Sequence, residues 1–196
     1  MSLVDENAFG LLVAFHDLED AEYSLEPPEF VVRFTEFTSE VLSYAEETPL
    51  GPRTNLLELG HALYFELADG DQSTDLIAWL RNLRTRLVER GFEVCAVLSH
   101  GSRWVEEADA GSSEPWPRLE ELGGTYRWMR ASRPSEPLRR ALAAEVATHG
   151  GLGEDSDGWG SGCYLDSEAM EALGKTLKNA PTPLEVAGAT FFRIGR

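Results

Sequence analysis

The sequence is poor in basic residues. Its 17 lysines and arginines stand against 34 aspartates and glutamates, so the formal net charge is −17. A field of this sign repels nucleic acid and anionic lipid. Composition therefore argues against direct binding to nucleic acid or to a membrane surface, and a basic protein is the partner that it favours.

Cysteines and long apolar runs are scarce as well. Cys95 and Cys163 are the only cysteines, and two cysteines without a secretion signal are typical of free, buried thiols in a reducing compartment. The opening residues lack the basic segment of a signal peptide. No apolar run reaches about 18 residues, the length that a transmembrane helix needs. We therefore expect a cytoplasmic protein.

Motifs of metal and cofactor sites are also missing. The glycine-rich stretch 153–162 places Asp155 and Asp157 before a glycine, as a calcium loop does, but Gly153 and Tyr164 occupy its first and last ligand positions. No lysine follows its glycines, as a phosphate-binding loop would require. The histidines lack the spacing of metal ligands; they are His16, His61, His100 and His149. We predict no cofactor, no metal ligand and no catalytic residue.

Cys95 and His100 are the nearest approach to a nucleophile with its base. Both belong to an apolar run of strand length. Residues five apart on a strand point to opposite faces of the sheet, and the neighbours of Cys95 are apolar. We therefore predict that Cys95 is a buried structural cysteine.

The acidic residues are concentrated near the start of the chain. Residues 1–72 contain 16 acidic residues and only two basic ones. Clustered carboxylates can steer a basic protein to its docking site, and an exposed tryptophan is a common anchor. The predicted partner-binding residues are Asp17, Glu19, Asp20, Glu22, Asp155, Asp157 and Trp159.

Apolar periodicity indicates an α+β fold with a mixed sheet of about six or seven strands and three or four helices. Two ferredoxin-like halves in one sheet would give this order. Strands are predicted at 9–15, 29–38, 61–68, 92–99, 125–131, 163–165 and 184–194. Helices are predicted at 39–47, 76–90, 135–150 and 167–179.

Two features of this organisation are specific enough to check. The helix at 76–90 carries leucines at helical spacing and should connect parallel strands at 61–68 and 92–99 by a right-handed crossover. The polar stretch 103–124 predicts a surface loop that leaves the sheet, or an internal boundary within a single domain of residues 1–196.

Composition and missing motifs favour a non-catalytic acidic protein that docks a basic protein, such as an inhibitor or an immunity protein against a toxin. Two alternatives stay open. One is a small enzyme whose carboxylates, cysteine and histidines converge only in the fold. The other is a homo-oligomeric structural subunit that pairs through the strand at 184–194 as a sheet edge.

Overall fold

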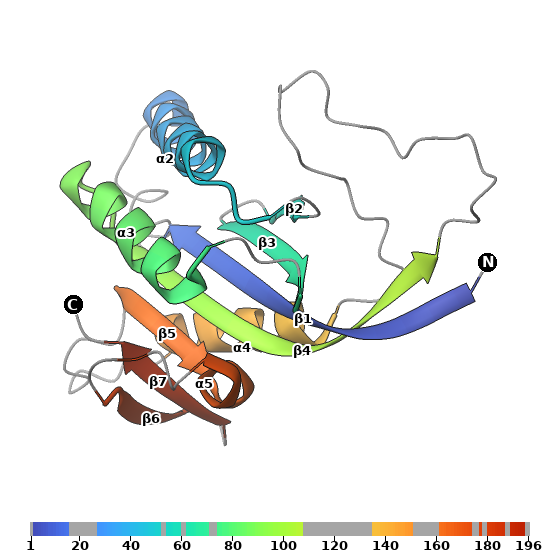
Figure 1. Cartoon of the computed structure of the whole chain (residues 1–196). Coiled ribbons are helices and arrows are strands. Elements are labelled where there is room, and N and C mark those ends of the chain that lie inside the picture. Colours follow the sequence, from blue (N-terminus) through green and yellow to red (C-terminus); the bar gives the residue numbers. More distant parts are fainter. Residues whose placement is uncertain are drawn as a thin grey trace, which may run out of the picture.

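The computed structural model describes residues 2–15, 27–51, 54–59, 62–70, 74–107, 135–150, 161–173, 177, 180–186 and 189–194. Within these residues, seven strands form one mixed sheet in the order β2-β3-β1-β4-β5-β7-β6, and four helices pack on it (Figure 1). The predicted α+β class and the predicted numbers of strands and helices are confirmed. None of the described helices combines the length and the apolar character needed to cross a membrane.

Four antiparallel strands make up the first part of the sheet. The strand β1 (Ser2–Phe15) lies at its centre and pairs with β3 (Ala62–Ala68) on one side and with β4 (Val94–Glu107) on the other. The short β2 (Asn55–Glu58), which the sequence did not predict, pairs with β3 at the edge. Since β3 and β4 both run antiparallel to β1, they are parallel to each other, as predicted, with β1 between them.

Two helices connect these strands. The helix α2 (Pro27–Glu47) follows β1, and α3 (Leu76–Glu89) joins β3 to β4. Asp75 caps α3, because its carboxylate accepts hydrogen bonds from the backbone N–H groups of Ile77 and Ala78. Gly91 ends the α3 turn with a φ of 76°, a conformation that favours glycine. The resulting β-α-β-β-α-β order with these pairings is that of a ferredoxin-like half.

The second half of the chain extends the sheet differently. The helix α4 (Glu136–Gly150) precedes β5 (Gly162–Asp166), which pairs with β4 in parallel. After α5 (Ser167–Leu173) the chain forms an antiparallel hairpin of β6 (Thr182–Val186) and β7 (Ala189–Ile194), and β7 pairs with β5. This half therefore adds three strands in the order β5-β7-β6.

The sheet separates two apolar layers. Leu11 and Val13 of β1 belong to the cluster that α2 and α3 cover, whereas Leu12 and Ala14 belong to the cluster that α4 covers. This alternation is the period of two expected of a strand buried on both faces. Figure 1 shows α2 and α3 together on one side of the sheet and α4 on the other.

The strand predicted at 29–38 is wrong, because this segment belongs to the helix α2. The helix predicted at 39–47 is confirmed, but it begins at Pro27 and not at Ser39. Phe37, Val41 and Tyr44 are buried at helical spacing, and this period outweighs the short alternation that suggested a strand. Prolines at the start of α2 are compatible with a first helical turn, whose N–H groups need no partner within the helix.

The single strand predicted at 184–194 is wrong as well, because the chain folds back on itself between β6 and β7. β7 pairs with β5 on one side and with β6 on the other. The backbone of β7 therefore offers no free edge, but β6, which contains the first residues of the predicted strand, forms an edge of the described sheet. Pairing of two copies through this edge, as the structural-subunit alternative required, stays a prediction.

The polar stretch that starts at residue 103 was expected to leave the sheet. Instead, β4 continues to Glu107, and Arg103 is only 5% exposed. The pairing of β4 with β1 extends from Val94 to Glu107, because β1 is itself long enough to provide a partner for each of these residues. The rest of the predicted surface loop, and the strand predicted at 125–131, lie outside the described residues.

Candidate functional site

Charged side chains are buried on the sheet face that carries α4. Arg103 of β4 and Glu66 of β3 are 5% and 1% exposed. The Nε of Arg103 donates a hydrogen bond to Oε1 of Glu6, its register partner on β1, at 2.7 Å. Its Nη1 lies 3.7 Å from Oε2 of Glu66. We call Glu6, Tyr64, Glu66, Arg103 and Ser135 the buried polar cluster.

Tyr64 links this cluster to the start of α4. Its hydroxyl donates to Oε1 of Glu66 at 2.9 Å and lies 3.4 Å from Oγ of Ser135. Ser135 in turn accepts the backbone N–H of Leu138 and so caps α4. Burial, and then the charge of Glu66, raise the pKa of Tyr64 well above its ordinary value. The hydroxyl therefore stays protonated and acts as a donor.

Glycines at two positions make room for these contacts. A Cβ on Gly10 would lie 2.7 and 2.8 Å from ring atoms of Tyr64, so only glycine lets the ring cross β1. A Cβ on Gly101 would lie 2.9 Å from Cβ of Glu136. The carboxylate of Glu136 accepts the N–H of Ser102 at 3.0 Å, which holds the pKa of Glu136 below its ordinary value. The first turn of α4 is thus fixed against β4.

The buried polar cluster fixes the arrangement of the strands and of α4 and does not itself carry out a reaction. Its tyrosine is protonated, its carboxylates are engaged by Arg103 and Tyr64, and the hydroxyl of Ser135 caps α4. Three strands and one helix meet in it, and a buried charge set of this kind favours one arrangement of the elements over others. Arg103 lies near the end of β4, and Ser135 lies at the start of α4.

A second polar group lies at the same end of the sheet. Nε2 of His100 is 3.4 Å from Oδ2 of Asp69, and the imidazole ring packs on Phe9 with 4.6 Å between centroids. The carboxylate of Asp166 accepts the N–H of His100 and the N–H of Ala169, the latter at 2.7 Å. Burial raises the pKa of Asp166. Asp166 therefore joins β4 to the first turn of α5.

The two cysteines are structural, as predicted. Cys95 packs in the apolar layer under α4, whereas His100 lies against Phe9 of the opposite layer, so the two side chains do not meet. Burial raises the pKa of Cys163 to about 12. Neither thiol is set up as a nucleophile, since a reactive cysteine needs a lowered pKa and access to solvent.

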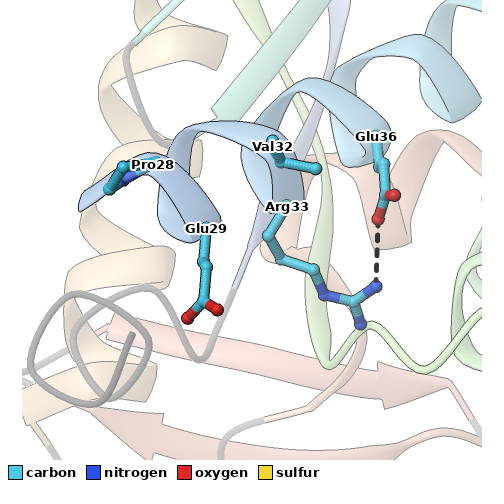
Figure 2. Close-up of a pocket in the computed structure, with 5 residues that line it drawn as sticks. All are labelled: Pro28, Glu29, Val32, Arg33 and Glu36. Atoms are coloured by element: carbon cyan, nitrogen blue, oxygen red, sulfur yellow. Dashed lines mark ion pairs between the residues drawn. The ribbon is translucent and has the colours of Figure 1, made fainter. Parts of the chain in front are cut away.

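The helix α2 has a shallow hollow of about 370 Å³ beside its first turns (Figure 2). Figure 2 shows its lining, which is Pro28, Glu29, Val32, Arg33 and Glu36. Arg33 is occupied within the fold, because its Nη2 donates to the carbonyl of Gly91 at 2.6 Å and its guanidinium stacks on Phe92. The hollow is an open, mostly apolar surface without convergent polar groups, unlike a small-molecule site.

All seven residues predicted to bind a partner lie outside the described residues: Asp17, Glu19, Asp20, Glu22, Asp155, Asp157 and Trp159. Within the described ranges, no group of three or more histidine, cysteine, aspartate or glutamate side chains fits a metal ion. Sequence reasoning missed the buried polar cluster. One signal was available, because Glu66 interrupts the otherwise apolar run of β3, and a lone charge in such a run needs a buried partner.

No family model matches the chain, and no curated protein matches its sequence. Solved structures do match its fold. The adenylyl cyclase CyaB from P. aeruginosa aligns with a TM-score of 0.61 and 10% identity, over 100% of this chain and 97% of that one. The guanylate cyclase domain of RhGC from Catenaria anguillulae, solved with GTP, aligns with a TM-score of 0.58 and 12% identity, over 98% and 99%.

A third match is the dimeric guanylyl cyclase domain of the RhoGC fusion protein from Blastocladiella emersonii, with a TM-score of 0.58 and 9% identity over 99% of this chain and 98% of that one. Identities this low establish the fold alone. The matched structures are nevertheless described as cyclases, and they align with 98–100% of this chain. The expectation of a non-catalytic acidic inhibitor or immunity protein docking a basic partner is therefore wrong, because composition reports surface charge and not the fold that carries it.

Proposed function

We propose that this chain is a nucleotide cyclase domain, which converts a purine nucleoside triphosphate into a 3′,5′-cyclic monophosphate and pyrophosphate. One observation carries the proposal: the fold agrees with that of adenylyl and guanylyl cyclases along essentially the full length of both chains. The alignment extends over the whole chain, and not only over the ferredoxin-like half that many unrelated proteins share.

The reaction sets clear demands on the site. The 3′-hydroxyl oxygen of the ribose forms a bond to the α-phosphorus, the bond from that phosphorus to the bridging oxygen breaks, and pyrophosphate leaves with the electron pair. The hydroxyl proton passes to a base or to water. Such a transfer depends on positioning the triphosphate and stabilising its negative charge. Within the described residues no group of side chains fits a metal ion, so none of these residues is assigned to one.

The described residues contribute a rigid frame. Ala14 near the end of β1 pairs with Ala62 at the start of β3, and Phe15 pairs with Val94 at the start of β4. Catalytic groups are usually held on loops that leave such a scaffold. Three strands of this frame are locked together by the ion pairs of Arg103 with Glu6 and Glu66.

We further propose that the active form contains two copies of the chain. One similar structure is described as a dimeric guanylyl cyclase domain, and another, from the same fusion protein, as a monomeric one. Light scattering after size exclusion, run with and without nucleotide, measures the assembly. A dimer in the presence of nucleotide supports this part of the proposal, and a monomer under all conditions that allow activity contradicts it.

The function is tested with the purified chain and the magnesium or manganese complexes of ATP and GTP. Products are separated by chromatography and identified by mass. We expect a cyclic monophosphate to form from at least one of the two, in proportion to protein concentration or more steeply. Heat-denatured protein is the control. If neither nucleotide binds or is converted, in calorimetry and in the product assay, the proposal is refuted.

A further inference from the structure

Three arginines gather at the end of the sheet where β5 begins. Nη2 of Arg84, from α3, donates a hydrogen bond to Oγ of Ser161 at 3.0 Å. Nη2 of Arg193, from β7, donates to the backbone carbonyl of Ser161 at 3.2 Å. Arg81 lies three residues before Arg84 on α3, and residues at this spacing are neighbours on one side of a helix. We call Arg81, Arg84 and Arg193 the arginine cluster.

The three charges act on the same region. Cys163 directly follows the start of β5, and the charges of Arg84, Arg81 and Arg193 each oppose the rise in its thiol pKa that burial causes. The guanidinium groups of Arg84 and Arg193 lie near each other, because both contact Ser161. Such a concentration of positive charge is unusual in a chain with a net charge of −17.

The arginine cluster differs from the other arginines of the described chain in its partners. Arg86 contacts Glu40 and Glu47, and Arg103 contacts Glu6 and Glu66. Within the described residues, no carboxylate lies within ion-pair distance of any member of the arginine cluster. The Nε of Arg84 is buried and has no hydrogen-bond partner there.

Neighbouring cations repel one another, which destabilises the charged groups, and an anion bound between them offsets this repulsion. Guanidinium groups match the oxygens of a phosphate, which they bind with two parallel hydrogen bonds. The Ser161 hydroxyl already accepts a hydrogen bond from Arg84, so its own proton is available for an anionic oxygen. The Arg84 guanidinium and the Ser161 hydroxyl are therefore adjacent donors, and the Arg193 guanidinium lies at the backbone of the same residue.

We propose that Arg81, Arg84 and Arg193, together with the Ser161 hydroxyl, form a binding site for the phosphate groups of a small molecule, either free pyrophosphate or a nucleotide. The site does not depend on the cyclase proposal, because its evidence is the charge and geometry around Ser161. Its ligand class is set by the donors, which suit a multiply charged tetrahedral oxyanion better than a single carboxylate.

Titration calorimetry of the full chain with pyrophosphate tests this site. We expect Arg84→Gln and Arg193→Gln each to weaken binding about tenfold, as loss of one charge-assisted hydrogen bond does. Arg81→Gln is the variant least able to disturb the fold, because no described hydrogen bond of Arg81 is lost, and it should weaken binding too. Arg139→Gln, on the exposed side of α4, is the matched control and should leave binding unchanged.

Two further arms separate the possible ligands. ATP and adenosine are titrated in parallel. If the ligand is a nucleotide, ATP binds and the same arginine substitutions weaken its binding, whereas adenosine does not bind. The double variant Asp155→Asn with Asp157→Asn tests whether the chain's own carboxylates take the place of the phosphate. Pyrophosphate binding that is absent from the native chain and gained in this double variant overturns the proposal. Binding that is insensitive to all three arginine substitutions overturns it as well.

Discussion

Arg103 and Glu66 form an ion pair across the central strand, with 3.7 Å between Nη1 and Oε2 and with both side chains buried. They belong to β4 and β3, which do not touch along their backbones because β1 lies between them. Glu6 and Gly10 of β1 are the register partners of Arg103 and Glu66. The pair therefore ties three strands together from one face.

Replacing Arg103 by methionine should be strongly destabilising. The substitution keeps most of the side-chain volume but leaves Glu66 buried without its cation, and breaking a buried pair in this way costs about 3–5 kcal/mol. Urea unfolding followed by circular dichroism measures the change in free energy. The control Arg139→Met, at an exposed position of α4, should change it by less than about 0.5 kcal/mol. Equal effects of the two substitutions would contradict a special role for Arg103.

Gly10→Ala should also destabilise the fold. The new methyl group would lie 2.7 Å from a ring carbon of Tyr64, and overpacking of a core position costs about 1–3 kcal/mol. Gly70→Ala is the matched control, because nothing lies within 4 Å of a Cβ at that position. Thermal unfolding should show a clear drop in Tm for the first variant only. A native Tm for Gly10→Ala would mean that the Tyr64 ring does not cross β1.

The carboxyl of Asp166 should make stability depend on pH. Its pKa lies above the ordinary value of 3.8, because burial penalises the charged form. The folded state then keeps the proton to a higher pH than the unfolded chain does, so this group lowers stability as pH rises from about 3.8 through the folded pKa. Asp166→Asn removes that dependence. As pH rises through this range, we expect the free energy of unfolding of Asp166→Asn to increase relative to that of the native chain.

A second variant separates charge from hydrogen bonding at the same position. Asp166→Ala loses the acceptor of the His100 and Ala169 N–H groups and should be less stable than Asp166→Asn by about 1 kcal/mol, as for other lost caps. Urea unfolding at several pH values measures all three proteins. Parallel stability curves for the native chain and Asp166→Asn would contradict the raised pKa.

Both thiols should be protected in the folded protein. Cys95 and Cys163 are 0% and 4% exposed, and the pKa of Cys163 is about 12, so its thiolate is scarce at neutral pH. Ellman's reagent at pH 8 should react with no thiol on the timescale of minutes in buffer and with two in denaturant. Rapid reaction of one thiol in buffer would contradict the burial of that cysteine.

Carboxylates that follow β1 should matter for nucleotide binding. Asp17 and Asp20 come soon after Phe15 in the sequence, and carboxylate oxygens meet a triphosphate favourably only through a cation such as Mg²⁺. The double variant Asp17→Asn with Asp20→Asn should therefore weaken binding of magnesium-ATP or magnesium-GTP at least about tenfold. The variant Glu46→Gln, an exposed carboxylate on α2, is the control. Equal affinities in all three proteins would remove these residues from the site.

The sequence predicted the parts of the fold in which one apolar period dominates. Only one apolar period fits the helix around Leu80 and Leu83, and only one fits the strand after Gly91. Both elements were predicted correctly. The start of α2 was predicted wrongly, because Phe30, Val32 and Phe34 alternate over a stretch too short to exclude a helix. Packing of α2 in one apolar cluster with α3 favours the helix. Local pattern is a weaker determinant there than packing.

The candidate site was less accessible to sequence reasoning. The buried polar cluster joins Glu6, Glu66 and Arg103, which are far apart in the chain, and only the register of three strands brings them together. The arginine cluster combines α3 with β7 for the same reason. Charge composition led to the wrong prediction of a docking protein. The count of 34 acidic residues describes the surface and carries no information about the fold.

The most direct test of the proposed function follows the α-phosphate of a labelled nucleotide during incubation with the chain. Cyclisation yields one cyclic monophosphate and one pyrophosphate for each triphosphate consumed, whereas hydrolysis yields a linear monophosphate or a diphosphate. We predict the first result, with the label of the consumed ATP or GTP recovered in the cyclic monophosphate. A linear product, or an unchanged triphosphate with both nucleotides, would contradict a cyclase.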